Sequence, residues 1–161
     1  MIDETVPLVR SQAIGHRVLM RLELGPKLPD VLADSIQLQQ VIINLIINAI
    51  DAMKAVTDRL RELVIRSQLY EGGVLVAVLD TGIGIEPEKA GRLFDAFFTT
   101  KPDGMGMGLS ICRSIIEAHG GRIWASANAG PGATVQFTLP RADTADRSPQ
   151  PDGQQKWLAH G

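Results

Sequence analysis

The sequence has 161 residues, a length that predicts one domain with short extensions. Hydrophobic residues make up 45% of the chain, enough for an ordinary core, whereas aromatic residues make up only 4%. The formal net charge is −2, so neither a nucleic-acid interface nor an anionic-membrane surface is expected, and the scarce aromatic rings argue against single-stranded nucleic acid as a ligand.

A single cysteine, Cys112, excludes an internal disulfide framework and fits a cytoplasmic location. The N-terminal residues show no basic-then-apolar signal pattern, and we see no uninterrupted apolar run of membrane-spanning length. We therefore expect no direct membrane contact from this segment, while the parent protein can still be membrane-anchored.

The first predicted elements are a short amphipathic helix over residues 3–15 and a strand over 16–24, where apolar residues alternate. A glycine- and proline-bearing turn follows. Asp34 or Ser35 is then predicted to cap a long helix that extends to about Ala55.

The second half alternates strands and helices. Two strands, 63–69 and 74–80, are joined by a glycine turn, and short helical segments are predicted over 87–93 and 109–119. Two last strands are expected over 122–127 and 133–139. This order predicts an α+β fold, a two-layer sandwich with a mixed, mostly antiparallel sheet packed on helices.

One stripe of the long helix is polar although the rest is apolar. Residues at three- and four-residue steps place five polar side chains on one face: Gln37, Gln40, Asn44, Asn48 and Asp51. The stripe is either a solvated face or a ligand-facing one. Asparagine is a poor helix former for a solvent face, and its neutral carbonyl oxygen suits one position on a Mg²⁺ ion that is otherwise held by phosphates and water.

A carboxylate ends the apolar strand before two glycines. Asp80 precedes Gly82 and Gly84, and the alternatives are an ordinary Asp-Thr-Gly turn or a base-recognition site. A carboxylate accepts a hydrogen bond from the amino group of adenine but repels the carbonyl of guanine. Such a charge-assisted bond contributes roughly 1.5–3 kcal/mol.

A second glycine segment directly precedes the predicted helix at 109–119. In residues 104–108 glycines alternate, which allows backbone N–H groups to approach a phosphate near a helix N-terminus, although a flexible hinge has the same composition. Lys101 lies just upstream and can add a positive charge. The G-x-x-x-x-G-K-[ST] phosphate loop and the G-x-G-x-x-G fingerprint are both absent from the sequence.

Four segments in this order resemble the catalytic ATP-binding domain of sensor histidine kinases, in the GHKL superfamily: NLIINAIDAM (44–53), DTGIGI (80–85), FDAFFTTK (94–101) and GMGMGLSI (104–111). The resemblance covers about residues 3–140. It implies a Bergerat-type ATP-binding fold and a catalytic domain over 1–140. Residues 141–161 are polar and aperiodic, and we expect them to form a disordered tail.

The resemblance also implies roles for individual residues with ATP and Mg²⁺ as cofactors. Asn48 would ligate the metal, Asn44 would lie beside the phosphates, Asp80 would recognise adenine, and residues 95–107 would form a lid. The other residues assigned to the nucleotide are Gly82, Gly84, Ile85, Lys101, Gly104, Gly106, Gly108 and Leu109.

Residues 44 and 133 bear on the chemistry that the resemblance implies. The superfamily's ATPases and serine kinases carry a glutamate base at position 44, and Asn44 cannot take a proton at neutral pH, which favours phosphoryl transfer to histidine. Relatives often place a threonine at the position of Ala133, where it helps to hold adenine, so recognition here is expected to depend more on Asp80; Thr134 is expected on the opposite strand face.

The family's phosphoacceptor, a histidine followed by an acidic residue, is missing: His16, His119 and His160 are better explained structurally. The expected partners are therefore a histidine-containing dimerisation domain, in the same parent protein or in trans, and a downstream response regulator. Two alternatives remain open: a stand-alone anti-sigma-factor-type serine kinase, and a non-catalytic nucleotide-dependent binding module.

Overall fold

A computed structural model describes residues 2–95, 108–142 and 155–158. The helices are α1 (Ile2–Gly15), α2 (Ser35–Met53), α3 (Pro87–Ala90) and α4 (Gly108–Ala118). The strands are β1 (Leu19–Leu24), β2 (Asp30–Ala33), β3 (Glu62–Tyr70), β4 (Gly73–Asp80), β5 (Ile123–Ala127), β6 (Ala133–Leu139) and β7 (Gln155–Leu158).

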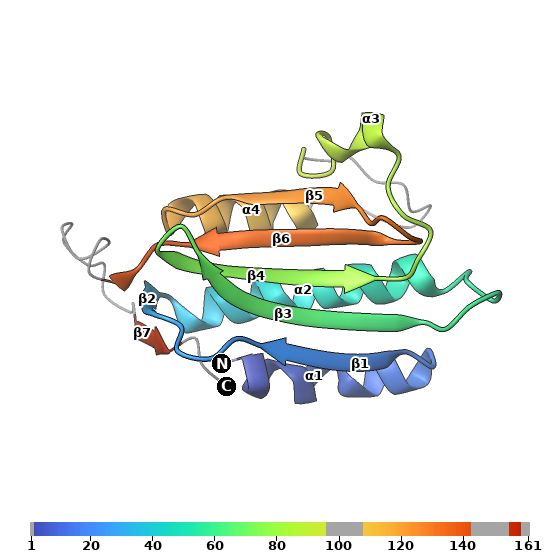
Figure 1. Ribbon diagram of the computed structural model, residues 1–161, viewed down its shortest axis with the longest axis horizontal. Helices are drawn as coiled ribbons and strands as arrows, with labels where there is room; N and C mark the ends of the chain where they lie inside the picture. Colours follow the sequence, from blue (N-terminus) through green and yellow to red (C-terminus); the bar gives the residue numbers. More distant parts are fainter. Residues whose placement is uncertain (1, 96–107, 143–154, 159–161) are drawn as a thin grey trace.

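Five strands form one sheet in the order β1-β3-β4-β6-β5. The β1–β3 pair is parallel and the other three pairs are antiparallel. The helices α1, α2 and α4 lie together on one face, with α2 between its neighbours, and the opposite face carries no helix in the described part of the chain (Figure 1). The predicted two-layer α+β sandwich with a mixed, mostly antiparallel sheet is confirmed.

The helix α2 is the centre of the helical layer. It begins where predicted, because the Asp34 carboxylate accepts hydrogen bonds from the N–H groups of Ile36 and Gln37 at 3.0 and 3.1 Å. By length and composition α2 could cross a membrane, but here it is a core helix. Its buried side chains are Leu38, Val41, Ile42, Leu45, Ile46, Ala49, Ile50 and Met53.

Alternation along β4 decides where its last residue points. Val74, Val76 and Val78 are buried and belong to the core cluster beneath the helices. Asp80 has the same parity, so its side chain also points to the helical side of the sheet. The intervening Leu75 and Ala77 face the other side, where they are nevertheless buried by longer side chains of neighbouring strands.

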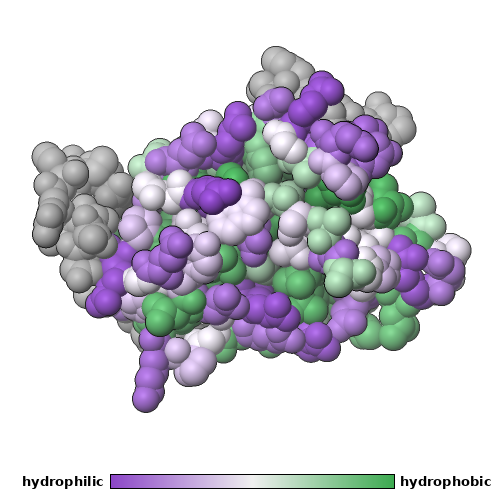
Figure 2. All heavy atoms as spheres, turned by 45° about the horizontal axis from the view of Figure 1, so that its top comes forward, coloured by the Kyte–Doolittle hydropathy of each residue, from purple (hydrophilic) through white to green (hydrophobic). Residues whose placement is uncertain are grey.

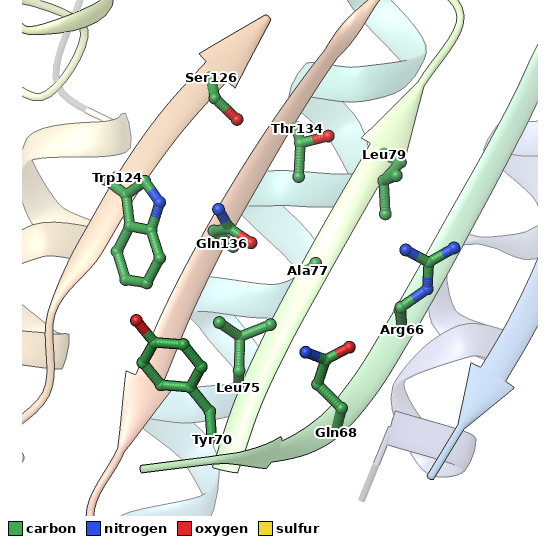
Figure 3. A pocket seen from close by; sticks show the side chains of 10 residues that line it. All are labelled: Arg66, Gln68, Tyr70, Leu75, Ala77, Leu79, Trp124, Ser126, Thr134 and Gln136. Atoms are coloured by element: carbon green, nitrogen blue, oxygen red, sulfur yellow. The ribbon is translucent and has the colours of Figure 1, made fainter. Parts of the chain in front are cut away.

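The open face of the sheet carries a mixture of hydrophilic and hydrophobic residues (Figure 2). A shallow hollow of about 450 Å³ lies on it, lined by side chains of β3, β4, β5 and β6 (Figure 3). At its rim Tyr70 and Trp124 lie with ring centroids 6.4 Å apart and ring planes tilted by 45°, and the Arg122 guanidinium lies 4.7 Å from the centroid of the Trp124 ring. Thr134 is on this face, as predicted from its strand position.

Four elements differ from the sequence prediction. The helix α3 ends at Ala90 rather than at residue 93. The strand β1 begins at Leu19 rather than at residue 16, because the N–H groups of His16, Arg17 and Val18 donate back to carbonyls of α1 and form the turn that ends this helix. The strand β2 was not predicted; it has four residues and pairs antiparallel with β7. That partner lies within the segment 141–161 for which an irregular tail was expected, so this expectation does not hold for Gln155–Leu158.

Candidate functional site

Asp80 is a buried carboxylate at the end of β4, with 7% of its surface exposed. Its Oδ1 accepts hydrogen bonds from the N–H of Gly82 at 2.8 Å and from the N–H of Ala133 at 3.3 Å. Burial raises the pKa of Asp80 above its usual value, and these two N–H groups oppose that rise. Among the described residues, none donates a hydrogen bond to Oδ2.

The turn after Asp80 is packed against the C-terminal end of α2. The Ile83 N–H donates to the carbonyl of Ala52 at 3.1 Å. A Cβ at Gly82 would lie 2.5 Å from the same carbonyl oxygen, so no larger residue fits there without movement of backbone. Gly84 has φ +81°, a conformation that favours glycine. The two positions predicted to shape the pocket thus require glycine for different reasons: Gly82 because of a close contact, and Gly84 because of its backbone conformation.

The other side of Asp80 is held by the hairpin that joins β5 to β6. The Asn128 amide donates to the main-chain carbonyl of Asp80 at 2.9 Å and to that of Pro131 at 3.3 Å. Gly132 has φ +95°, and a Cβ there would lie 1.9 Å from the Asp80 carbonyl oxygen. Backbone from β4 and from this hairpin therefore meets at contact distance around the carboxylate.

A guanidinium also reaches this turn. Arg59 lies in the connection between α2 and β3, and it donates from Nε to the carbonyl of Thr81 at 2.8 Å and from Nη2 to the carbonyl of Gly82 at 2.7 Å. The Thr81 hydroxyl in turn donates to the carbonyl of Leu60 and accepts from the N–H of Glu62. The turn after Asp80 and the connection after α2 are consequently fixed to one another.

The polar stripe of α2 divides into two parts. Gln37 and Gln40 are exposed, whereas Asn44, Asn48 and Asp51 are half-buried towards the same end of the helix as Ala52. The stripe is thus not uniformly a solvated face. Its second half shares the end of the domain at which β4 stops and β6 begins (Figure 1).

Asn44 connects α2 to α4. Its amide nitrogen donates to the Sγ of Cys112 at 3.7 Å. Cys112 is fully buried, and burial raises the pKa of its thiol to about 11, so the group stays a protonated thiol at neutral pH. Among the described residues, no donor binds the amide oxygen of Asn44, which leaves that oxygen available to a ligand.

The glycine segment is described only at its end. Gly108 and Leu109 begin α4; Gly108 is exposed and Leu109 packs against the core. Lys101, Gly104 and Gly106 lie outside the described residues, and so does the expected lid apart from its first residue, Asp95. Within residues 2–95, 108–142 and 155–158, no group of three His, Cys, Asp or Glu side chains is placed to hold a metal ion.

Sequence reasoning missed three contributors to the site. Arg59 and Asn128 lie in irregular connections that carry no periodic signal, and the N–H of Ala133 is a main-chain group without side-chain information. The glycine- and proline-rich sequence of this segment indicates a turn, but it does not indicate the hydrogen bond from the Asn128 N–H to the Gly132 carbonyl. The sequence indicated the carboxylate of Asp80, whereas the groups that hold Asp80 and its turn by hydrogen bonds come from elements distant in the chain.

Comparisons with known proteins identify the class of this fold and site. Residues 33–143 match the family described as histidine kinase-, DNA gyrase B- and HSP90-like ATPases. The chain is 48% identical over 143 residues to the sensor protein FixL of Bradyrhizobium diazoefficiens, and the match covers 89% of this chain and 28% of FixL. The chain therefore spans less than a third of that relative.

Solved structures agree with the sequence match. The catalytic domain of histidine kinase ThkA superposes with a TM-score of 0.77 at 34% identity, covering 89% of this chain and 92% of that one. ThkA in complex with response regulator TrrA gives 0.75 at 31%, covering 91% and 40%. Full-length ShkA in complex with AMPPNP gives 0.76 at 29%, covering 87% and 29%.

The chain belongs to the histidine kinase-, DNA gyrase B- and HSP90-like ATPase family. Within that family it is a catalytic domain of the sensor histidine kinase type, because it matches the catalytic domain of a histidine kinase over nearly the whole of both chains and is similar in sequence to a sensor protein. The resemblance found in four sequence segments is confirmed.

Proposed function

We propose that this domain binds Mg-ATP beside Asp80 and transfers the γ-phosphate to a histidine on a separate dimerisation domain. One observation carries the proposal: a buried carboxylate keeps one oxygen bonded to the backbone, while no described residue donates to the other. A buried acceptor without a donor is unfavourable, so a ligand that supplies one is favoured at this position.

Adenine fits the free oxygen of Asp80. Its exocyclic amino group is a donor, whereas guanine carries an acceptor at the same ring position, which two lone pairs would repel. Gly82 and Gly84 have no side chains that would separate the backbone from the base, and Ile85 is half-buried beside them. We assign these four residues to the adenine pocket.

The polar end of α2 fits the phosphates. Asn44 and Asn48 are one helical turn apart on the same half-buried face, and α4 begins at Gly108 in the adjacent helix. We propose that Asn48 gives Mg²⁺ one neutral oxygen and that Asn44 contacts the phosphates, with Gly108, Leu109, Lys101, Gly104 and Gly106 on the other side. A bound Mg²⁺ ion would supply neutralisation of phosphate charge.

The residue types favour a histidine acceptor over water or serine. Asn44 has no basic atom, and the buried thiol of Cys112 to which it donates holds its proton at neutral pH. A neutral imidazole nitrogen attacks without a base, so the domain needs only to position the nucleotide. The amide of Asn44, oriented by Cys112 on the helical layer, and the carboxylate of Asp80 at the end of β4 would do this together.

The proposal includes partners and extent. We take residues 1–140 as the catalytic domain, a response regulator as the downstream recipient of the phosphate, and the cytoplasm, where ATP is available, as the location. The structure of ThkA in complex with response regulator TrrA supports, by similarity, a response regulator as the recipient of the phosphate.

The experiment uses this chain, labelled Mg-ATP and a helical hairpin with a His-acidic phosphoacceptor from a FixL-type kinase. We expect the chain alone to remain unlabelled and the hairpin to acquire acid-labile label, typical of phosphohistidine. The variant Asp80→Asn should abolish transfer and binding of ATP analogues in calorimetry, since the amide NH₂ would face the amino group of adenine.

Two results would reject the proposal in different ways. Acid-stable label on a serine-bearing partner would point to the serine-kinase alternative. Binding of ATP without label in any pairing with histidine hairpins would point to a non-catalytic nucleotide-dependent module.

A further inference from the structure

We propose that Arg59 is a positioning residue for adenine recognition: its guanidinium holds the peptide between residues 81 and 82, and that peptide fixes the Asp80 carboxylate. The inference rests on the proposed function, in which Asp80 binds adenine. It adds a residue from a connection outside the four sequence segments that define the family resemblance.

The contacts of Arg59 are directed at one turn. Nε and Nη2 donate to two successive carbonyls, those of Thr81 and Gly82, at 2.8 and 2.7 Å. The remaining terminal nitrogen, Nη1, pairs with Asp58 at 3.1 Å. With its side chain 31% exposed, Arg59 is shielded from water more than a typical surface arginine, while its partner Asp58 is 76% exposed.

The Thr81 carbonyl and the Gly82 N–H belong to the same peptide group. That N–H makes the 2.8 Å hydrogen bond to Oδ1 of Asp80. A cation on the carbonyl side of a peptide polarises it and strengthens donation from its N–H side. Arg59, the 81–82 peptide and Asp80 therefore form a chain in which a positive charge supports a buried negative one through a single peptide.

The rotation of that peptide also decides where the carboxylate points. If the peptide turned over, Oδ1 would lose its shorter N–H bond and Asp80 would be held only by the 3.3 Å contact from Ala133. Oδ2, the atom available to a ligand, would then be free to rotate out of place. Two donors on neighbouring carbonyls oppose such a rotation more than one donor does.

The position needs an arginine for geometric reasons. Its planar guanidinium presents two N–H groups in a fixed fork, whereas the lysine ammonium is a point charge on a flexible stem. A lysine at position 59 can keep the positive charge and one of the two carbonyl contacts. Arg59→Lys is therefore expected to preserve part of the effect, and Arg59→Ala none of it.

The test compares ADP with IDP, whose base carries a carbonyl where adenine has its amino group. Calorimetry with Mg²⁺ gives the affinity ratio for the unmodified chain, Arg59→Ala, Arg59→Lys, Asp80→Asn and Arg66→Ala. Arg66→Ala is the matched control. It removes the same charge and two contacts of 2.7 Å to Glu23, and Arg66 lies on the sheet face opposite the Asp80 side chain.

We expect Arg59→Ala to weaken ADP binding roughly tenfold, the scale of one charge-assisted hydrogen bond, with little change for IDP. The ADP-to-IDP ratio should therefore fall for Arg59→Ala, fall less for Arg59→Lys, and stay constant for Arg66→Ala. A general loss of stability would change both affinities together and leave the ratio unchanged.

The outcomes separate the two proposals. If the unmodified chain binds ADP no better than IDP, or Asp80→Asn keeps its preference, the proposed function fails. If Asp80→Asn loses the preference and the Arg59 variants retain it in full, the inference about Arg59 is wrong. Should Arg59→Ala not fold, the ratio for Arg59→Lys decides, since an unchanged ratio there overturns the inference.

Discussion

Individual residues of the site are held in place by the protein itself. The Asp80 carboxylate accepts two backbone N–H bonds, its own carbonyl accepts the Asn128 amide, and the turn that follows it receives Arg59. Burial disfavours the charged form, and the N–H groups only oppose this, since the pKa of Asp80 remains raised. The fold thus keeps an unfavourable group where a ligand can use it.

This raised pKa predicts a specific dependence of stability on pH. A carboxyl group whose pKa is raised in the folded state stabilises the fold when protonated, fully below its unfolded value near 3.8, and that contribution is lost as the pH rises through the raised folded value. Relative to Asp80→Asn, which does not titrate, the unmodified chain should therefore gain stability as the pH falls from neutral towards 3.8.

The measurement is urea unfolding of both proteins over a pH series, because all other titrating groups are common to both and cancel in the difference. Asparagine keeps the Oδ1 acceptor for Gly82 and Ala133, so the comparison isolates the charge. A difference that is independent of pH, or that shrinks on acidification, would contradict the prediction.

Gly82 offers a second test at the scale of a residue. Its φ is not positive, so the reason for glycine is the close approach to the Ala52 carbonyl, 2.5 Å from the position of a Cβ. Gly82→Ala should cost about 1–3 kcal/mol of unfolding free energy, because the added Cβ would force the turn after Asp80 and the end of α2 at Ala52 apart. ADP affinity should fall as well, since the turn that carries the Asp80 contact is displaced from α2.

Gly91→Ala is the matched control. Gly91 has φ −72°, and a Cβ there would meet nothing within 4 Å, so an alanine should leave both the stability and the affinity for ADP unchanged. Equal effects of the two substitutions would show that the contact with Ala52 is not what requires glycine at position 82.

At the scale of elements, the helices α2 and α4 are joined at both ends of their contact. Near the site, Asn44 donates to Cys112. At the other end, His119 follows α4, with Nδ1–H donating to the carbonyl of Ile115 at 2.7 Å and Nε2 accepting the Asp34 N–H at 3.1 Å. These bonds require the neutral Nδ1–H tautomer and give His119 a structural role, in agreement with the sequence interpretation.

Asp34 bonds His119 through its main-chain N–H and caps the N-terminus of α2 through its carboxylate. Replacing it by alanine removes the side-chain bonds to Ile36 and Gln37 but keeps the main-chain bond to His119. We expect Asp34→Ala to lower the unfolding free energy by about 1 kcal/mol, measured by urea denaturation. Asp34→Asn retains a capping oxygen and should cost clearly less; the same loss for both variants would rule out capping as the cause.

At the scale of the whole molecule, the candidate site joins the two layers. Asp80 comes from the sheet, Ala52 and the asparagines from the central helix, and Asn128 from the edge hairpin. A ligand that contacts Asp80 and the asparagines should therefore stabilise both layers and not a local segment. The open sheet face, with its hollow at Tyr70 and Trp124, lies on the other side and takes no part.

Mg-ADP should accordingly raise the unfolding free energy of the whole domain, by about 2.7 kcal/mol at roughly 100 times the dissociation constant. Urea unfolding followed by circular dichroism and by tryptophan fluorescence should shift together when both are measured in a Trp157→Phe background, in which Trp124 is the only tryptophan. Trp124 lies on β5, the strand that precedes the β5–β6 hairpin. Asp80→Asn should show no shift with ADP. Divergent transitions for the two probes would mean that the nucleotide stabilises only part of the molecule.

Much of this architecture was predictable from local patterns. Apolar periodicity located α2, α4 and the strands β3, β4 and β6 to within a few residues, because each buries a long regular stripe. Asp80 was recognisable because a charged residue at the end of an apolar strand has no explanation in the core. Short elements such as β2 were not predictable, since four residues have little pattern of their own and depend on a partner.

The sequence by itself determined the class of fold, the apolar stripes and the residue types that make a nucleotide site chemically reasonable, because these follow from the order of side chains along each element. Only the tertiary structure decided how Asp80 is held: the N–H of Ala133 bonds its carboxylate, the amide of Asn128 bonds its main-chain carbonyl, and the guanidinium of Arg59 bonds the turn that follows it. These groups are distant in the chain, and their contacts with the Asp80 turn exist only once the layers have packed.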